Sequence, residues 1–388
     1  MKKRLQQALP LLLVILVVAS AYGFLHIRLG TDPFEHSVYD SYTLQALAWR
    51  EGHISLGQDY PYLELAVFEG DWYVSFPPVP SIPQWLLTFF FGSQTPDGLL
   101  IKCYALAAMV ILYHCLHKRM KWKPWQAALF SGLFAFGGPL LTITLNGGVW
   151  FQAQALNFLL LVAAFSAMAF QRPTLCCILY ALSVGCRPFS VLFGPALLLM
   201  YLEIPRNKRP RLYPGILAGL AIAGCYAAYN YARFGNPLEF GHNYLPEFTR
   251  IETGQFSFSY LLKNVRQFFF GLPIQNGQWQ LFGFSMFLSN LPLTLLVILF
   301  LWDLLCGRLT LRKLAVFCLM AAQLFCLLLH KSFGGLQFGA RYTLELTPYL
   351  LVWLYLEKRR GPVLWENVLL GAGAAFNIWG AYLLNSNL

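Results

Sequence analysis

Residues 9–27 read LPLLLVILVVASAYGFLHI and follow basic residues at positions 2–4. A helix needs about 20 apolar residues to cross the hydrocarbon core of a bilayer. Because this run contains no Asp, Glu, Lys or Arg, we expect it to span a membrane with the basic residues on the cytoplasmic side. Ala19-Ser20-Ala21 also resembles a signal-peptide cleavage site, but the apolar run continues beyond it, so we expect an uncleaved signal-anchor.

The composition of the whole chain has the same character. Of 388 residues, 57% are hydrophobic, 16% are aromatic and only 12% are charged. Soluble domains average about 45–50% apolar and about 25% charged residues, and their surfaces must be covered with polar groups. Disordered chains are rich in charge and poor in aromatic residues. The composition therefore excludes both classes and indicates an all-α, polytopic membrane protein.

Apolar runs recur along the chain and predict about eleven transmembrane helices in a single transmembrane domain, residues 1–388. The stretch 174–203 is interrupted by Arg187-Pro188, and proline breaks a helix. We expect this stretch to enter the membrane and return as two short helices. The expected spans are residues 9–27, 99–117, 125–145, 150–170, 174–203 counted twice, 213–233, 282–303, 314–331, 343–357 and 363–384.

The net charge of +11 is distributed in a way that predicts topology. Basic clusters occupy the short links 118–123, 206–211, 308–313 and 358–360. Twelve of the seventeen acidic residues lie in two long loops. The positive-inside rule places the basic links in the cytoplasm and the long loops on the opposite face. Since the membrane accounts for every basic cluster, membrane lipids are expected partners and nucleic acid is not.

The two long loops, residues 30–98 and 234–281, are expected to cover an active site. The first is rich in aromatic residues, acids and proline, but it is too short and apolar for an independent domain. Within it, segments 40–51 and 82–92 are expected to form amphipathic helices that lie on the membrane surface.

Asp40 is the leading candidate for chemistry. It follows the first span and begins a predicted helix, in Tyr39-Asp40-Ser41-Tyr42-Thr43. A carboxylate at this place can cap the helix by accepting backbone N–H groups. Alternatively, it can act as a general base that takes a proton from an incoming hydroxyl. The local sequence leaves both roles open.

Several motifs together resemble the GT-C glycosyltransferases, in particular the bacterial members related to protein O-mannosyltransferases and to the aminoarabinose transferase of lipid A. Besides Asp40, the motifs are Gly52-His53, the loop GDWYVSFPP at 70–78, Arg187-Pro188, and Gly339-Ala340-Arg341-Tyr342 with Pro348 following. The resemblance implies an inverting enzyme in the cell membrane, in bacteria the inner membrane, with its active site on the non-cytoplasmic side. It would move a sugar from a polyprenyl-phosphate donor to a hydroxyl of a lipid, glycan or protein acceptor.

The resemblance also implies roles for two residues. Asp40 matches the family's catalytic base, and Arg341 matches an arginine that binds the donor phosphate. Many relatives carry two adjacent acids where this chain has Asp40-Ser41, and an acid where it has Asn146-Gly147. No cofactor is therefore expected, although a divalent metal remains open. The histidines at 36, 53, 242 and 330 show no metal-ligand spacing either.

Further candidates are less specific. Arg187, Lys331 and Lys102 are cations near the outer ends of spans and are expected donor-phosphate ligands. The alternative for the lysines is snorkelling to the interface, and for Arg187 binding to the carbonyls of the helix break. Expected substrate contacts come from Tyr42, Glu64, Glu69 and Tyr342.

Two further alternatives stay open. Arg341 can pair with Glu345, four residues on, or with lipid headgroups, instead of with a donor phosphate. The protein can also be a transporter or lipid flippase, although that class usually has inverted repeats and sites at the membrane midplane. A cleft at the outer interface containing Asp40 and Arg341 would favour the enzyme, and a midplane cavity would favour transport.

Overall fold

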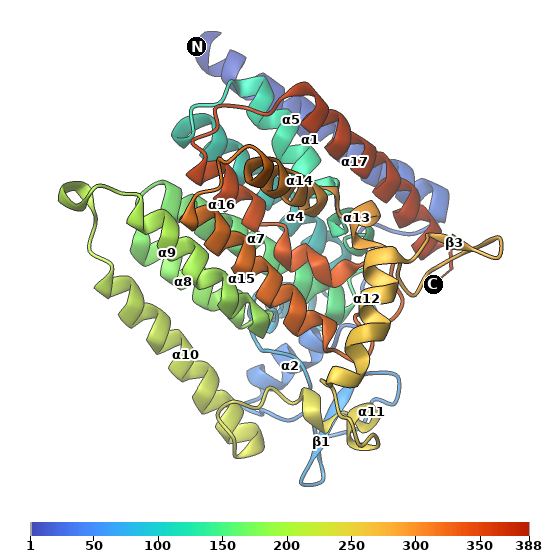
Figure 1. The fold of residues 1–388 in the computed structure, drawn as a ribbon. Helices are drawn as coiled ribbons and strands as arrows, with labels where there is room; N and C mark the ends of the chain where they lie inside the picture. Colours follow the sequence, from blue (N-terminus) through green and yellow to red (C-terminus); the bar gives the residue numbers. More distant parts are fainter. Residues whose placement is uncertain (1, 388) are drawn as a thin grey trace.

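The long helices match the expected spans closely (Figure 1). The computed structural model describes residues 2–387, with side chains from residue 7 onward, so the side chains of Lys2, Lys3 and Arg4 lie outside the described part. Within it, five helices are long and apolar enough to cross a membrane. The protein is therefore a helical membrane protein. These helices are α1 (Lys2–Leu29), α4 (Asp97–His114) with its π-helical extension η1 (Cys115–Arg119), α7 (Val149–Ala169), α15 (Leu311–Leu328) and α17 (Leu364–Asn385).

The other helices of the bundle are shorter, except for α10 (Tyr213–Phe234), which has 22 residues. They do not decide the number of crossings, which stays a prediction. These helices are α5 (Pro124–Phe136), α6 (Leu140–Ile143), α8 (Pro173–Val184), η2 (Pro188–Phe193), α9 (Gly194–Leu202), α10 (Tyr213–Phe234), α13 (Met286–Ser289), α14 (Leu291–Leu305), η6 (Arg341–Leu346) and α16 (Tyr349–Leu356).

The continuous helices predicted over 125–145 and 282–303 are wrong, as is the one predicted over 343–357, which divides into η6 and α16 at Thr347-Pro348. The first breaks at Gly137-Gly138, between α5 and α6. The second breaks at Asn290, whose side chain accepts from the backbone N–H of Leu293 at the start of α14. These two breaks contact one another, because the Gly137 carbonyl accepts a hydrogen bond of 3.1 Å from Leu291 N–H. The Gly137 carbonyl at one interruption and the Leu291 N–H at the other thus satisfy each other.

The stretch 174–203 reverses direction, as the Arg187-Pro188 break predicts. Helix α8 ends at Val184, and the Gly185 carbonyl accepts a hydrogen bond of 3.1 Å from Val79 in the first long loop. The chain then returns through η2 and α9 to Glu203, which pairs with Arg312 in a basic link. The turn and the two ends of this stretch therefore lie at opposite ends of the bundle.

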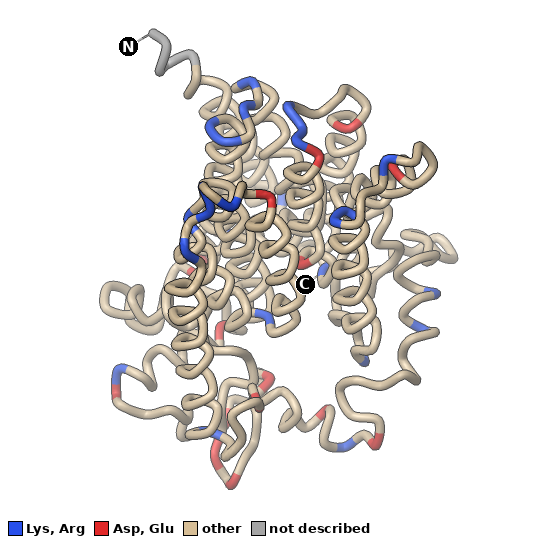
Figure 2. The backbone as a smooth tube through the Cα atoms, turned by 60° about the vertical axis from the view of Figure 1, so that its left-hand side comes forward, with Lys and Arg blue, Asp and Glu red and all other residues tan. Residues whose placement is uncertain are grey.

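Charge separates the molecule into a basic end and a loop end (Figure 2). The basic end comprises links 118–123, 206–211, 308–313 and 358–360. Figure 2 shows most of the blue segments in the upper half of the view and most of the red segments in the lower half. The Trp122 indole donates to the Arg359 carbonyl at 2.7 Å, which ties two of these links together. The loop end comprises residues 30–98 and 234–281 and carries most of the acidic residues. This separation agrees with the charge pattern read from the sequence.

The first long loop forms the two expected amphipathic helices, α2 (Ser41–Arg50) and α3 (Ser81–Phe91). Helix α3 buries Ser81, Gln84 and Thr88 and exposes its large apolar side chains, such as Phe90 at 83%. An exposed apolar face suits a helix that lies in lipid. The loop also contains a hairpin that was not expected, β1 (Leu65–Phe68) paired antiparallel with β2 (Asp71–Val74).

The second long loop and the remaining link are built from short elements. Helix α12 is amphipathic and buries Asn264 and Phe268 while Phe270 is exposed. The elements are η3 (Arg206–Lys208), η4 (His242–Tyr244), α11 (Pro246–Thr249), η5 (Phe258–Tyr260), α12 (Leu261–Phe270), and the antiparallel pair β3 (Ile274–Gln275) and β4 (Gln278–Trp279).

Helix α7 is the centre of the fold, and 94% of the residues in its most apolar stretch are buried. Its polar side chains Gln152, Gln154 and Asn157 are buried as well. Asn157 accepts from Ser190 Oγ at 2.9 Å, and Gln152 accepts from Gln84 at 2.8 Å. Gln154 accepts from Arg341 Nη1 at 3.3 Å. These bonds hold the reversing stretch and helix α3 against the core.

Candidate functional site

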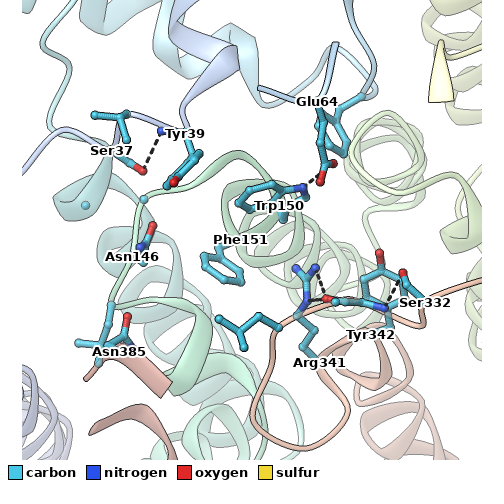
Figure 3. Close-up of a pocket in the computed structure, with 18 of the residues that line it drawn as sticks. Ser37, Tyr39, Glu64, Asn146, Trp150, Phe151, Ser332, Arg341, Tyr342 and Asn385 are labelled. Atoms are coloured by element: carbon cyan, nitrogen blue, oxygen red, sulfur yellow. Dashed lines mark hydrogen bonds between the residues drawn. The ribbon is translucent and has the colours of Figure 1, made fainter. Parts of the chain in front are cut away.

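A cavity of about 680 Å³ opens at the loop end (Figure 3). Its walls come from both long loops and from the segments around residues 145–151, 187 and 330–342. The lining residues on which the site depends are Glu35, His36, Glu64, Trp150, Phe151, Arg187, His242, Glu247, His330, Arg341 and Tyr342. A cavity at this end, away from the middle of the bundle, is the location that the enzyme hypothesis predicts.

Arg187 is one of the cations that line this cavity. It lies in the break between α8 and η2, and its Nε donates to Glu345 Oε1 at 2.5 Å. Glu345 is 1% exposed, so the carboxylate holds the guanidinium from behind. Among the described residues, the Nη atoms of Arg187 have no hydrogen-bond partner, and Arg187 lines the cavity. The side chain therefore offers an anion the two N–H groups of each terminal nitrogen.

Arg341 enters the same cavity from the start of η6 (Figure 3). Its Nε and Nη2 donate to the Gly334 carbonyl at 2.9 and 2.6 Å, and Nη1 donates to Gln154 at 3.3 Å. The alternative in which Arg341 pairs with Glu345 is wrong, because Glu345 pairs with Arg187. Gly334 has a φ of 124° and the Arg341 Nε lies 3.1 Å from the place of a Cβ there, so a side chain would crowd this contact.

Tyr342 lies between the two arginines. Its ring centroid is 4.6 Å from the Arg187 Cζ and 5.2 Å from the Arg341 Cζ. Stacking on an aromatic ring fixes a guanidinium in one plane while leaving its edge free. Three side chains named from the sequence, Arg187, Arg341 and Tyr342, thus form one cationic floor.

Glu64 is one of four carboxylates that line the cavity, with Asp32, Glu35 and Glu247, and it lies across the cavity from Arg341 (Figure 3). Its Oε2 accepts a hydrogen bond of 2.8 Å from the Trp150 indole (Figure 3). Surrounding protein raises the pKa of the Glu64 carboxyl by desolvation, and the Trp150 hydrogen bond partly opposes this rise. No other donor in the described residues binds its carboxylate oxygens, so one oxygen remains available to a ligand.

Asp40 lies behind the cavity wall instead of in it. It is 2% exposed and is absent from the residues that line the cavity, although its neighbours 35–39 are present. Its Oδ1 accepts from the backbone N–H groups of Tyr42 and Thr43 at 3.1 and 3.2 Å. Its Oδ2 accepts from the Thr43 hydroxyl at 2.5 Å and from Gln84 at 3.0 Å. The N-cap role is therefore present in the structure, and burial raises the pKa of the Asp40 carboxyl.

A set of metal-type ligands surrounds Asp40. One ligand atom each from His36, Asp40 and Asp97 lies within 4.8 Å of the others. Asp97 already accepts from the backbone N–H groups of Ser37 and Gly98, and the His36 Nδ1 lies 3.7 Å from Asp97 Oδ2. An imidazole nitrogen and two carboxylates are a donor set that a divalent cation accepts, but the His36 Nδ1 donates to the Thr95 carbonyl at 3.1 Å and would have to give up this bond to be the ligand. The structure leaves the expectation of no cofactor untested.

Four other predicted residues are not brought into the cavity. Lys102 is 5% exposed and donates to the Gly98 carbonyl at 2.7 Å. Lys331 points to Glu247, with 3.8 Å between Nζ and Oε2. Glu69 lies at the tip of the β1–β2 hairpin, and Tyr42 is fully buried against Phe76. Their expected substrate or phosphate contacts have no support in this geometry.

Two pairs of residues that line the cavity were given no functional role from the sequence. His242 and His330 line the cavity with their ring centroids 6.5 Å apart, although 88 positions separate them in the chain. Trp150 and Phe151 line it as well. Nothing in local spacing brings the histidines together, whereas the aromatic pair stands next to Asn146-Gly147, which the resemblance had already marked.

A second, smaller cavity of about 280 Å³ adjoins the first. The two share a wall made of Phe76, Arg187, His242, His330 and Tyr342. Most of the remaining lining of the smaller cavity is apolar and includes Phe189, Phe240, Phe256 and Leu327. Arg187 is thus a cation in contact with a polar space on one side and an apolar space on the other.

Solved structures show where this architecture recurs. The chain aligns with the apo oligosaccharyltransferase from Archaeoglobus fulgidus at a TM-score of 0.55 and 14% identity, over 97% of this chain and 55% of that one. It aligns with ArnT from Cupriavidus metallidurans bound to undecaprenyl phosphate at a TM-score of 0.53 and 13% identity, over 96% and 76% of the two chains. Apo ArnT gives a TM-score of 0.50 at 15% identity, over 89% and 59%.

These neighbours are GT-C glycosyltransferases. At such low identity the likeness establishes the fold, and the chain has the GT-C fold that its motifs predict. It spans 55% of the length of the oligosaccharyltransferase and 59% of apo ArnT. No protein-family model matches the chain, and no curated protein matches its sequence.

Proposed function

We propose that this protein is a GT-C glycosyltransferase that moves a sugar from a polyprenyl-phosphate donor to an acceptor hydroxyl, with inversion at the anomeric carbon. The observation that carries the proposal is the loop-end cavity, where the Arg187 and Arg341 guanidinium groups face the Glu64 carboxylate. Cations that hold a phosphate and a base that meets a hydroxyl are the two requirements of this reaction. The undecaprenyl phosphate bound to ArnT supports a lipid phosphate as the ligand.

The donor phosphate is proposed to bind at the cationic floor. Arg187 carries the free N–H groups, and Arg341 adds charge beside it while Tyr342 fixes both planes. When the acceptor oxygen bonds to the anomeric carbon, the bond from that carbon to the phosphate oxygen breaks, and the electron pair stays on the phosphate. The two guanidinium groups stabilise this developing charge, and polyprenyl phosphate leaves as an anion.

The base is proposed to be a carboxylate of the first long loop, and two assignments compete. The resemblance assigns Asp40, which reaches an acceptor only if segment 36–39 moves. The cavity lining favours Glu64, which has a free oxygen and faces Arg341. In either case the carboxylate takes the hydroxyl proton as the new glycosidic bond forms.

The basic end is proposed to be cytoplasmic and the loop end non-cytoplasmic, in a bacterial inner membrane crossed eleven times. The separation of basic links from acid-bearing loops supports this orientation. Nucleotide sugars are confined to the cytoplasm, so a site on the other face requires a lipid-borne donor. Loops 30–98 and 234–281, which both line the cavity, then form the cover of the active site. The acceptor is a lipid, glycan or protein hydroxyl.

The test is a transfer assay on the purified protein in lipid nanodiscs. Undecaprenyl-phosphate-linked radiolabelled glucose, mannose and aminoarabinose are offered with a lipid extract, a glycan mixture and a hydroxyl-bearing peptide as acceptors. The proposal predicts release of undecaprenyl phosphate together with a labelled acceptor. Transbilayer movement of a labelled lipid in liposomes, without any transfer, would instead support the flippase alternative.

A further inference from the structure

His242 and His330 occupy the wall between the two cavities and are not used in the proposed transfer. Both line both cavities. Their ring centroids are 6.5 Å apart, so a single hydroxyl group can contact both rings. His330 is 5% exposed, so the pair is an enclosed site and not part of the outer surface.

The hydrogen bonds of each ring fix its tautomer. The His242 Nδ1 lies 3.1 Å from the Ser75 carbonyl, so Nδ1 must carry the proton and Nε2 is an acceptor. The His330 Nδ1 accepts from Ser332 N–H at 3.3 Å, so its Nε2 carries the proton and is a donor. In the described part of the chain, neither Nε2 has a protein partner. The wall therefore presents one unused acceptor and one unused donor.

The surroundings keep this pair neutral. Burial, and repulsion by Arg187, lower the pKa of His242 to about 4, against the Ser75 hydrogen bond that opposes the shift. Aromatic rings complete the site, with Phe76 at 5.2 Å from His242, and with Phe256 at 5.2 Å and Tyr342 at 5.7 Å from His330. A neutral donor and acceptor among aromatic faces match a hydroxyl group on a ring with apolar faces.

We propose that His242 and His330 bind a hydroxyl of the transferred sugar, which accepts from His330 Nε2–H and donates to His242 Nε2. The inference rests on the proposed function and adds the site that recognises the sugar. Arg187 lies in the same wall, so a sugar bound here is joined to a phosphate within reach of the cationic floor. The pair then distinguishes a sugar-bearing donor from the bare lipid phosphate that remains after transfer.

The test compares two probes on the full chain in nanodiscs. Dissociation constants are measured for undecaprenyl phosphate and for undecaprenyl-phosphate-linked glucose, mannose and arabinose. Wild type should bind at least one linked sugar more tightly than undecaprenyl phosphate. His242→Phe and His330→Phe, which keep a ring, should each reduce this gain by about 3- to 10-fold, the effect of one lost neutral hydrogen bond. His114→Phe, at an exposed position in the last turn of α4 and outside both cavity linings, is the matched control and should change nothing.

Unchanged affinity for undecaprenyl phosphate in the Phe variants shows that they are folded. His242→Gln, which retains an acceptor, and His330→Gln, which retains a donor, should keep most of the gain and provide a second measurement should a Phe variant fail to fold. Equal affinity of wild type for bare and sugar-linked lipid phosphate would overturn the inference, as would Phe and Gln variants that all retain the full gain. Failure of wild type to bind undecaprenyl phosphate at all would instead overturn the proposed function.

Discussion

Asp40 and Glu64 are carboxylates of the same loop, but the fold uses them differently. Asp40 is buried at the start of α2 and accepts four hydrogen bonds, from two backbone N–H groups, Thr43 Oγ1 and Gln84. Glu64 faces the cavity and accepts one, from Trp150. A carboxylate with every lone pair engaged stabilises structure, whereas one with a free oxygen can receive a proton from a ligand.

The comparison shows why position along the chain is insufficient to identify a base. The resemblance selects Asp40 because it follows the first span, and the same position makes it the N-cap of α2. The role of a base also requires contact with the acceptor, and that contact depends on which side chains the folded loop turns toward Arg341. Substitution of each carboxylate in turn shows which of the two acts as the base.

The largest effect is expected from removing the base. Glu64→Gln and Asp40→Asn each keep the shape of the side chain but remove the proton acceptor. Loss of the base should lower the transfer rate by about 10²–10⁴-fold while undecaprenyl phosphate still binds. Rates and binding are measured for both variants in nanodiscs.

The other carboxylate should show a different signature. If Glu64 is the base, Asp40→Asn should mainly lower thermal stability, because Asn still caps a helix but cannot accept from both Thr43 and Gln84. Near-wild-type turnover in well-folded Glu64→Gln would exclude Glu64, and the same result in Asp40→Asn would leave only its capping role.

A smaller loss is expected at Arg341. Arg341→Lys keeps a positive charge but cannot hold the Gly334 carbonyl with Nε and Nη2 while also contacting a phosphate. The loss of charged hydrogen bonds should weaken donor binding by about 1–3 kcal/mol. Titration with undecaprenyl phosphate measures this change. An unchanged dissociation constant in Arg341→Ala would instead indicate an arginine bound to lipid headgroups.

Glu345 is expected to act by positioning Arg187. In Glu345→Ala the Arg187 Nε loses its partner and the guanidinium can rotate away from the cavity, so donor affinity should fall about tenfold. Glu345→Gln retains an oxygen for Nε and should rescue most of the affinity. Since a general loss of stability would weaken donor and acceptor binding alike, the KM for the acceptor is the internal control. Unaltered donor affinity in Glu345→Ala would refute the positioning role.

The smallest expected effect is a shift in the pH profile. The pKa of Glu64 is raised by burial, so transfer should decline with falling pH from a higher pH than an ordinary glutamate would give. The Trp150 hydrogen bond favours the charged form, and Trp150→Phe should therefore move this decline to still higher pH. A profile that does not move in Trp150→Phe would point to Asp40, which Trp150 does not contact.

The sequence predicted the elements of the fold better than the residues of the site. The thickness of the bilayer sets the length of an apolar run that crosses it. Helices α4, α7, α15 and α17 therefore begin and end within a few residues of their expected limits. The β1–β2 hairpin was missed although Glu69-Gly70, with φ of 51° and 86°, is a turn pair between strand-forming residues. The breaks at Gly137 and Asn290 depend on a contact between distant segments, which no local pattern encodes.

The site depends on similar long-range contacts. Arg341 was predicted from the family resemblance, and Arg187 because charged residues near the membrane are rare and suggest function. The pairing of Glu345 with Arg187 instead of Arg341, and the meeting of His242 with His330, join segments far apart in the chain. Lys102 and Lys331 looked equivalent to the arginines in sequence, but each donates to a backbone carbonyl, of Gly98 and of Glu247, and neither lysine lines the cavity.

The most direct test of the account is binding of undecaprenyl phosphate to wild type, to Arg187→Ala/Arg341→Ala, and to Arg250→Ala, whose arginine is exposed at the loop end outside the cavity lining. We expect saturable binding to wild type and to Arg250→Ala, and loss of binding in the folded double variant. Equal binding to all three proteins would contradict the claim that the loop-end cavity holds a lipid phosphate.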